Sequence, residues 1–443
     1  MPNEYSLLMA LAEGTKLLFA LAFGACVGSL MNVLVYRLPR GLDIVSPPSR
    51  CPVCDTRLTW RENIPIFGWV LLRGRCRFCK APISSEYPIV EASIAIIFGT
   101  LYAIWYMLPR EWGWVDWLRP EWAVNGLVLT WPIFIVDLAL VSCLVAMTLI
   151  DAKTRLIPLG LLWFPAIVGV IGHGLLGGVL DFRGIELRHH AKGFDWAIPT
   201  PGDGGWWWVG ASIGAALGLV AGNLLVWTGL LKRSFADYDA WEQRAIADLP
   251  PEKRPAANPN DPEAQAELWI QYPHARREMI RELAFLAPAI ILGLIGAKVA
   301  TNLAGPWVYD AARLAVVPAS PVPMWLDALT GSLMGYLIAG GVVWAARILA
   351  TLAFGKEAMG LGDVHLMAGV GACLGWIDPI LAFFAAAFIG VAFEVLRSIF
   401  ARRVRRTLAF GPCLALGTIL ILVMKPGAET LLSMLMHRSI DLP

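Results

Sequence analysis

Long apolar stretches recur along the chain and are separated by short polar segments. Most of them hold about 20 residues, the length that an α-helix needs to cross a hydrocarbon core about 30 Å thick. One stretch is short, so we expect nine or ten transmembrane helices in an all-α polytopic integral membrane protein. A further, interfacial helix is expected near residues 428–437. The predicted spans are 6–36, 88–108, 125–150, 157–181, 206–231, 283–303, 326–352, 364–377, 380–398 and 408–425.

The composition agrees with this pattern. Of the 443 residues, 57% are hydrophobic and only 16% are charged, whereas a soluble domain needs a polar surface to stay in solution. The first span contains Glu13 and Lys16 and continues without a small-residue cleavage site, so we expect a retained helix rather than a signal peptide. The net charge of +2 is near balance, and we expect no nucleic-acid partner.

The placement of Lys and Arg predicts the topology. Basic residues outnumber acidic ones in the polar loop 37–87, which places this loop on the cytoplasmic side. Alternation from there puts the N-terminus outside and the polar, Pro-rich insert 232–282 inside. The expected divisions are the first transmembrane helix at 1–36, the loop module at 37–87, helices at 88–231, the insert at 232–282 and helices at 283–443.

Four of the eight cysteines lie in the module 37–87 as two pairs, Cys51-x2-Cys54 and Cys76-x2-Cys79. Each CxxC turn can offer two thiolates to one metal ion, and two such turns complete a tetrahedral site. Four thiolates leave no position for water, so the sequence predicts a structural zinc ion. Two disulfides, which a reducing cytoplasm disfavours, and a redox CxxC are the alternatives.

Two aspartates are candidates for catalysis because each ends or begins a predicted helix on the cytoplasmic side. Asp151 ends the third span, and Asp363 closes the sequence Gly360-Leu361-Gly362-Asp363. A facing pair of carboxyl groups shares a proton, so one can activate water while the other protonates a carbonyl oxygen. The two glycines, Gly360 and Gly362, would allow the backbone to bend and a substrate to approach.

Each of these signals also has a structural interpretation. Aspartates at membrane edges often only cap helices. Asp137 competes with Asp151 but lies about 21 Å deeper by helical rise. The glycines at 210, 214, 218 and 222 match G-x-S-x-G in part, but their spacing favours a close-packed helix face. His365 could tune the aspartates or be a plain helix residue, and inter-helix hydrogen bonds are the simple reading of Asn32 and Glu91.

Several stretches of the chain recur together in a known order. They are Gly28 to Pro39, the four cysteines with Asn63-Ile64-Pro65 and Arg73-Gly74-Arg75, Pro82-Ile83-Ser84, Tyr87 to Glu91, Asp151 with Pro158, Gly360 to Asp363, and Phe410-Gly411-Pro412. In this order they resemble the type IV prepilin peptidases, GxGD aspartyl proteases of the bacterial inner membrane. Two features depart from the family pattern: Leu159 follows Pro158, where Asp or Asn is frequent, and the loops 182–205 and 232–282 are long.

The resemblance implies catalytic roles for Asp151 and Asp363 and zinc ligation by Cys51, Cys54, Cys76 and Cys79. It also implies prepilin or pseudopilin substrates, whose basic leader is cut at the cytoplasmic face, and methylation of the new N-terminus with S-adenosylmethionine. Membrane lipid is the other expected partner. Two alternatives stay open from the residues: a relative that only methylates, and a transporter that uses the aspartates as a proton relay.

Overall fold

The computed structural model describes residues 4–109, 111–154, 158–184, 205–248, 272–305, 307–310, 315–320, 322–355, 357, 359–401 and 410–438. The chain forms two compact units. One contains Met1–Leu161 and Val423–Ile440, and the other contains Leu162–Leu422 and Asp441–Pro443.

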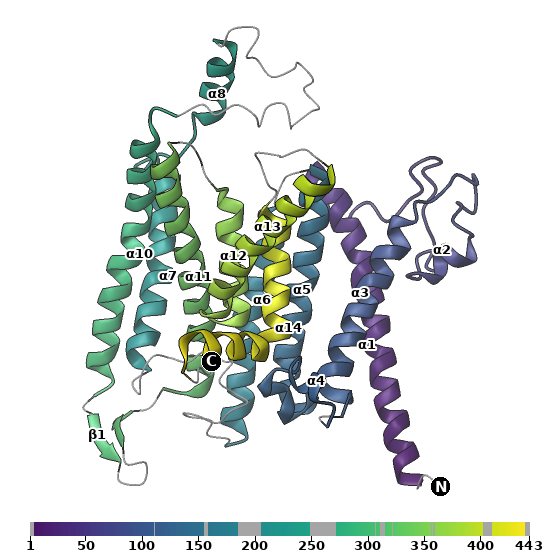
Figure 1. The fold of residues 1–443 in the computed structure, drawn as a ribbon, viewed down its shortest axis with the longest axis horizontal. Helices are drawn as coiled ribbons and strands as arrows, with labels where there is room; N and C mark the ends of the chain where they lie inside the picture. The colour runs from purple at the N-terminus through teal and green to yellow at the C-terminus, as the bar shows by residue number, and fades with distance from the viewer. Residues whose placement is uncertain are drawn as a thin grey trace. The chain divides into compact units, whose positions relative to one another are not determined.

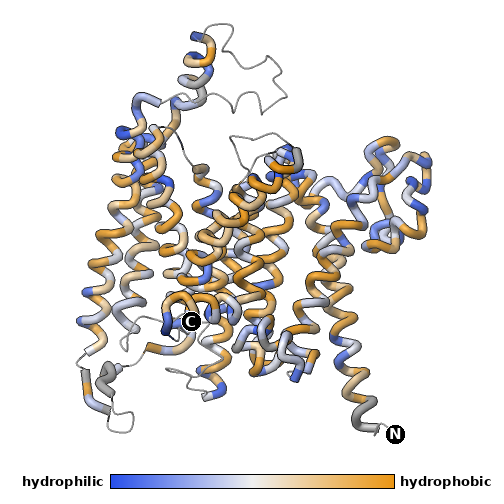
Figure 2. The backbone as a smooth tube through the Cα atoms, in the orientation of Figure 1, coloured by the Kyte–Doolittle hydropathy of each residue, from blue (hydrophilic) through white to orange (hydrophobic). Residues whose placement is uncertain are grey.

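Helices dominate the described residues (Figure 1). Nine of them are long and apolar enough to cross a membrane, and α12 is a shorter apolar helix, which confirms the expected all-α membrane class. Figure 2 shows the hydrophobic residues along these helices. The elements are α1 (Glu4–Arg37), η1 (Leu38–Arg40), α2 (Phe67–Leu71), α3 (Glu86–Tyr102), η2 (Ala103–Met107), α4 (Gly113–Asp116), η3 (Glu121–Asn125), α5 (Leu127–Thr154), α6 (Leu159–Phe182), α7 (Trp206–Trp227), α8 (Tyr238–Ala247), α10 (Ala275–Leu303), β1 (Trp307–Asp310), β2 (Ala315–Pro318), α11 (Met324–Phe354), α12 (Leu361–Leu374), α13 (Asp378–Ala401) and α14 (Phe410–Met436).

Three details differ from the pattern expected from hydropathy. Helix α10 begins at Ala275, eight residues before the expected span at 283–303, because its first two turns are charged and lower the local hydropathy. Strands β1 and β2 pair in an antiparallel two-stranded sheet that the sequence did not predict. Helix α14 continues through 436 but has a non-helical residue at Met424, close to the expected break at 425–428. Residues 185–204 of the long loop 182–205 and residues 249–271 of the insert 232–282 lie outside the described residues.

In the first unit, α1 and α3 pack closely and in opposite directions. A Cβ added to Gly24 would lie 2.8 Å from the Cα atom of Ala95, and one added to Gly28 would lie 2.7 Å from the Cα atom of Glu91. Near the same end, the Asn32 side chain donates a hydrogen bond of 3.1 Å to the Tyr87 carbonyl. Asn32 therefore makes the inter-helix hydrogen bond expected of it.

In the second unit, α7 and α10 pack through the predicted glycine face. A Cβ on any of the four glycines would meet backbone atoms of α10, within 3 Å at each position, so no side chain fits there. The two helices run in opposite directions, because each later glycine of α7 faces an earlier residue of α10. Gly210 faces Gly296, Gly214 faces Leu292, Gly218 faces Ala289 and Gly222 faces Phe285. The helix-packing interpretation is confirmed, and the nucleophile motif is excluded.

In each unit a polar contact joins the ends of two helices. In the first unit, Lys153 near the end of α5 pairs with Glu86 at the start of α3 at 2.7 Å, and the loop module joins α1 to α3. In the second unit, the Tyr272 amide before α10 donates to the Gly355 carbonyl after α11 at 2.8 Å. The end of α5 thus lies beside the start of α3, and the start of α10 lies beside the end of α11.

Candidate active site and metal centre

The four predicted zinc ligands lie on two turns with the same backbone pattern. In the first turn the Cys51 amide donates to Thr56 at 3.0 Å and the Asp55 amide donates to Cys51 at 2.9 Å. In the second turn the Cys76 amide donates to Ala81 at 2.8 Å and the Lys80 amide donates to Cys76 at 3.1 Å. Asp55 and Lys80, which each follow the second cysteine of a pair, have φ angles of 53° and 62°. Each turn thus points both of its sulfur atoms to the same side.

The sulfur atoms form one cluster. All four lie within 4.8 Å of one another, with Cys51 Sγ 3.8 Å from Cys79 Sγ and Cys54 Sγ 4.0 Å from Cys76 Sγ. A tetrahedral zinc ion with Zn–S distances of about 2.3 Å separates its sulfur ligands by roughly 3.8 Å. All four cysteines are free thiols, so the two-disulfide alternative does not describe this cluster. The donor set and its spacing fit a structural zinc ion.

The thiols also differ in acidity. Hydrogen bonds from the side chain and the backbone of Thr56 lower the pKa of Cys54 to about 6. The Ala81 backbone acts in the same sense on Cys79, but desolvation and the neighbouring cysteines outweigh it and raise the pKa of Cys79 to about 11. The contacts with Thr56 thus favour the thiolate form of Cys54, the form that binds zinc, and binding of zinc must release protons from the cluster.

Removal of one sulfur should empty the metal centre. We expect Cys54→Ser to lower zinc from one ion per chain to nearly none, because a hydroxyl is a poor replacement for a thiolate in a closed four-sulfur site. Metal analysis of the purified chain measures this. Cys26→Ser, which changes an exposed cysteine of α1, is the matched control and should keep its zinc. Equal zinc in both variants would contradict the four-thiolate centre.

Asp151 lies in the last turn of α5 in the first unit. Asp151 is buried, with 9% of the residue exposed. It directly follows Ile150, which is fully buried. Two residues later, Lys153 makes its ion pair with Glu86. Asp137 is also on α5 and is 1% exposed. The structure therefore puts Asp151 at the polar end of the helix and Asp137 in its interior.

Asp363 lies in the first turn of α12 in the second unit and is also 9% exposed. Its amide donates to the Gly360 carbonyl at 3.2 Å. Gly360 has a φ of −70°, which any residue can adopt, and a Cβ there would come no closer than 3.9 Å to a described atom. The space beside Gly360, rather than an unusual backbone angle, is therefore what this glycine provides.

The far end of α12 is held by polar groups of neighbouring helices. The Ser332 hydroxyl donates to the Ala372 carbonyl at 2.5 Å, and His173 lies 2.9 Å from the Cys373 carbonyl. Because a helix end leaves carbonyl groups without helical partners, these contacts fix a helix too short to span a membrane by itself. His365 contacts the Trp163 ring at 6.2 Å between centroids, which suits a helix residue in an aromatic contact.

The segment before α12 is held by a buried ion pair that the sequence analysis missed. Arg347 of α11 and Glu282 of α10 are 1% and 2% exposed and lie 3.1 Å apart. Arg347 also pairs with Glu357 at 2.7 Å and donates to the Met359 carbonyl. Met359 immediately precedes Gly360, so this arginine fixes the start of the helix that carries Asp363. The sequence did contain a signal for this ion pair, because an arginine and a glutamate within or beside apolar helices are expected to have partners.

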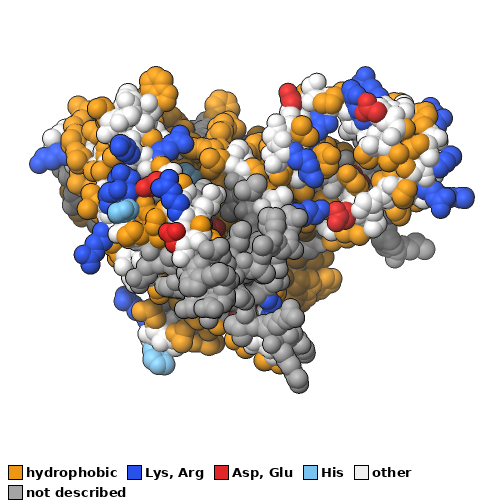
Figure 3. Space-filling model, turned by 90° about the horizontal axis from the view of Figure 1, so that it is seen from above, with side chains coloured by type: hydrophobic (Ala, Val, Ile, Leu, Met, Phe, Trp, Pro, Cys, Tyr) orange, Lys and Arg blue, Asp and Glu red, His pale blue; other side chains and the backbone are white. Residues whose placement is uncertain are grey.

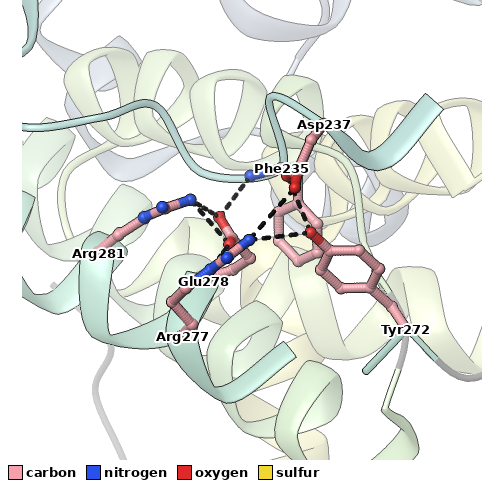
Figure 4. Close-up of polar contacts among 6 residues, drawn as sticks. All are labelled: Phe235, Asp237, Tyr272, Arg277, Glu278 and Arg281. Atoms are coloured by element: carbon pink, nitrogen blue, oxygen red, sulfur yellow. Dashed lines mark hydrogen bonds and ion pairs between the residues drawn. The ribbon is translucent and has the colours of Figure 1, made fainter. Parts of the chain in front are cut away.

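A second polar cluster holds the two ends of the insert together (Figure 4). Its centre is Glu278, which is fully buried and accepts hydrogen bonds from the Phe235 amide at 2.9 Å, from Arg277 at 2.9 Å and from Arg281 at 2.8 Å. Figure 4 shows the three donors converging on this carboxylate. The chain before the insert is thereby tied to the first turns of α10.

The same cluster extends to Asp237. The Tyr272 hydroxyl donates to Asp237 at 2.9 Å, and Arg277 donates to it at 3.3 Å. The Tyr272 hydroxyl, followed by Arg277, lowers the pKa of the Asp237 carboxyl, so this group is ionised at neutral pH. Because the Tyr272 amide also bonds to Gly355, the ends of the insert connect to the same segment that leads to α12.

Three acidic side chains in and beside the zinc module have basic partners within the chain. Asp55 pairs with Arg50 at 3.0 Å, and Glu62 pairs with Arg77 at 3.4 Å. Glu86 pairs with Lys153. The structure thus brings the four cysteines together and places each aspartate at a helix end in its own unit. The approach of Asp151 to Asp363 stays a prediction.

Comparison with known proteins adds to this geometry. The family described as Bacterial Peptidase A24 N-terminal domain matches residues 22–105, which include the zinc module. A prepilin leader peptidase/N-methyltransferase of Myxococcus xanthus (strain DK1622) is 35% identical over 181 residues, which cover 38% of this chain and 47% of the relative. The proteins of the same name from Aeromonas hydrophila and Stutzerimonas stutzeri are 33% and 32% identical and are covered over 62% and 55% of their lengths, against 40% and 35% of this chain.

The chain thus spans about half to three-fifths of the length of these relatives. No solved structure matches it. The sequence similarity and the four-cysteine module point to the same family as the resemblance of the motifs. The chain therefore has, among its described residues, nine helices that could cross a membrane and is similar to prepilin leader peptidase/N-methyltransferases over part of its length, and its residues 22–105 match the Bacterial Peptidase A24 N-terminal domain.

Proposed function

We propose that the chain is a membrane aspartyl endopeptidase that removes the basic leader of prepilins or pseudopilins. The observation that carries this proposal is the similarity to the named relatives, together with the family match over residues 22–105, which contain the zinc module. The buried aspartates at helix ends support it, because ionisable side chains are costly to bury in a membrane protein and commonly mark a functional site. We place the site at the cytoplasmic face of the bacterial inner membrane, where the basic loop 37–87 is expected.

In the proposed mechanism Asp151 and Asp363 act as a pair that shares one proton. The ionised carboxylate takes a proton from a water molecule, whose oxygen attacks the scissile carbonyl carbon. The protonated partner donates its proton to the carbonyl oxygen, and collapse of the tetrahedral intermediate passes a proton to the leaving amine. The zinc ion takes no part in these steps, because four thiolates would fill its coordination shell.

We further propose that the chain methylates the new N-terminus with S-adenosylmethionine, as the name of its relatives indicates. S-adenosylmethionine supplies an electrophilic methyl group, and the free amine that cleavage creates is the nucleophile. Methylation must therefore follow cleavage in time, since the nitrogen of an intact peptide bond is not nucleophilic.

Reconstitution of the full chain in liposomes with a prepilin tests both activities. We expect mass spectrometry to show loss of the leader, and addition of one methyl group only when S-adenosylmethionine is present. Omission of S-adenosylmethionine is the internal control and should leave cleavage intact. If the zinc-loaded chain methylates a pre-cleaved pilin but leaves the prepilin whole, the chain is a methyltransferase only and the peptidase proposal is wrong.

A further inference from the structure

Helix α2 of the zinc module is fixed on one side. Gly68 is buried, and a Cβ there would collide with the Glu62 carbonyl. The Trp69 indole donates a hydrogen bond of 3.1 Å to the Ile83 carbonyl, and its ring covers Gly74, where an added Cβ would lie 2.8 Å away. A helix of five residues is not stable alone, so these contacts hold it in place.

The other side of α2 is apolar and faces outward. Phe67, Val70 and Leu71 are 65%, 55% and 75% exposed, and Trp60 nearby in the chain is 72% exposed. Single exposed apolar residues are ordinary, but three on one short helix that the module holds rigidly form a defined face. Since Gly68 and Trp69 face inward, these three side chains cannot turn into the module.

Helix α3 sets the position of this apolar face along the direction of the span. The amide of Ile66, the residue before α2, donates a hydrogen bond of 2.6 Å to the carboxylate of Glu91. Glu91 lies five residues after the start of α3, which is about 7.5 Å along the helix axis. Figure 1 shows α2 beside the upper part of α3. Ile66 has a φ of 63°, an unusual value for a branched residue, which indicates that its position is closely determined.

The sequence of α3 changes from polar to apolar at this level. Helix α3 begins at the polar Glu86, which pairs with Lys153, and becomes apolar within its first two turns. The Glu91 contact therefore places α2 beside the part of α3 where polar residues give way to apolar ones. The Glu91 bond is to the module rather than to another helix, which corrects its expected inter-helix role.

The residues around α2 have the charge that a lipid surface attracts. Arg61, Arg73 and Arg75 are exposed, and the Arg61 guanidinium lies 5.3 Å from the Trp60 ring centroid. The view of Figure 3 shows Lys and Arg side chains among hydrophobic ones on the zinc module, at the right of the picture. Aromatic residues with flanking arginines are typical of segments that lie at a membrane interface.

We propose that the apolar face of α2, formed by Phe67, Val70 and Leu71, inserts into the bilayer leaflet beside α3 and anchors the zinc module on the membrane surface. The occupant of this face is lipid, with acyl chains against the three apolar side chains and lipid phosphates near the arginines. The anchor holds the module at the level of the end of α5, where Lys153 pairs with Glu86 two residues after Asp151.

Carbene labelling of the native, zinc-loaded chain in liposomes of phosphatidylethanolamine and phosphatidylglycerol tests this. An apolar aryl diazirine dissolved in the bilayer and a charged diazirine in the water are used in parallel, followed by trypsin and mass spectrometry. The peptide 62–73 contains α2, and the peptide 51–57 contains Val53, which is 71% exposed in the first cysteine turn and is the matched control for Leu71.

We expect the bilayer reagent to label 62–73 several-fold more than 51–57 per exposed apolar residue, and the aqueous reagent to show the reverse. Labelling of 62–73 mainly from the water would overturn the proposal. Protection of 62–73 from both reagents would also overturn it, because a protein surface, such as a second copy of the chain, would then cover α2.

Discussion

Asp151→Asn and Asp363→Asn are each expected to abolish prepilin cleavage, with a loss of at least about 10²–10⁴-fold, the usual contribution of a general acid or base. Asparagine keeps the size of the side chain but can neither hold the negative charge nor exchange the proton. Either change alone removes one of the two roles, so the single and double variants should be similarly inactive. The measurement is the rate of leader removal in reconstituted membranes at equal amounts of protein.

Asp137→Asn is the matched control for this result. Asp137 is on the same helix as Asp151 and is buried, at 1% exposure, but it lies about 21 Å away along the axis. We expect cleavage to stay near that of the unchanged chain. Near-normal cleavage by either Asp151→Asn or Asp363→Asn would refute the proposed pair, whereas loss in all three variants would indicate a general effect on the fold.

The features that the sequence predicted best depend on local spacing. A CxxC pair fixes two sulfur atoms within one turn, so the metal cluster follows from residues a few positions apart. The glycines from 210 to 222 define one helix face for the same reason, and the structure adds only its partner, α10. The spans were also predicted well, because apolar length is a property of a continuous segment.

The features that the sequence did not predict depend on pairs far apart in the chain. Glu282 and Arg347 are 65 residues apart, and nothing in either helix alone selects the other as its partner. The Glu91 contact with Ile66 is similar, since a carboxylate in an apolar helix could bond to any neighbouring backbone. The start of α10 was missed because two turns of charged residues read as part of the insert. The pairing of Asp151 with Asp363 also joins residues far apart in the chain, and it stays a prediction from the sequence.

Arg347→Met should destabilise the chain by about 3–5 kcal/mol, because it leaves the buried Glu282 carboxylate without its counter-ion. Glu282 is 2% exposed and, among the described residues, would keep one hydrogen bond, of 2.8 Å, from the Trp344 indole. The free energy of unfolding, measured by titration with denaturing detergent in mixed micelles, gives this difference. Arg50→Met is the matched control: its side chain and that of its partner Asp55 are 42% and 78% exposed, and loss of such a surface pair costs about 0–1 kcal/mol.

The double variant Glu282→Met with Arg347→Met separates stability from positioning. Replacement of both charges by apolar side chains should recover most of the lost stability, because no buried charge is then left alone. Cleavage should stay reduced, because the Met359 carbonyl and Glu357 no longer have the donor that holds the segment before Gly360. Since the stability is restored, a loss of cleavage in this variant reports the placement of Asp363. Full cleavage by the double variant would show instead that the ion pair serves the fold alone.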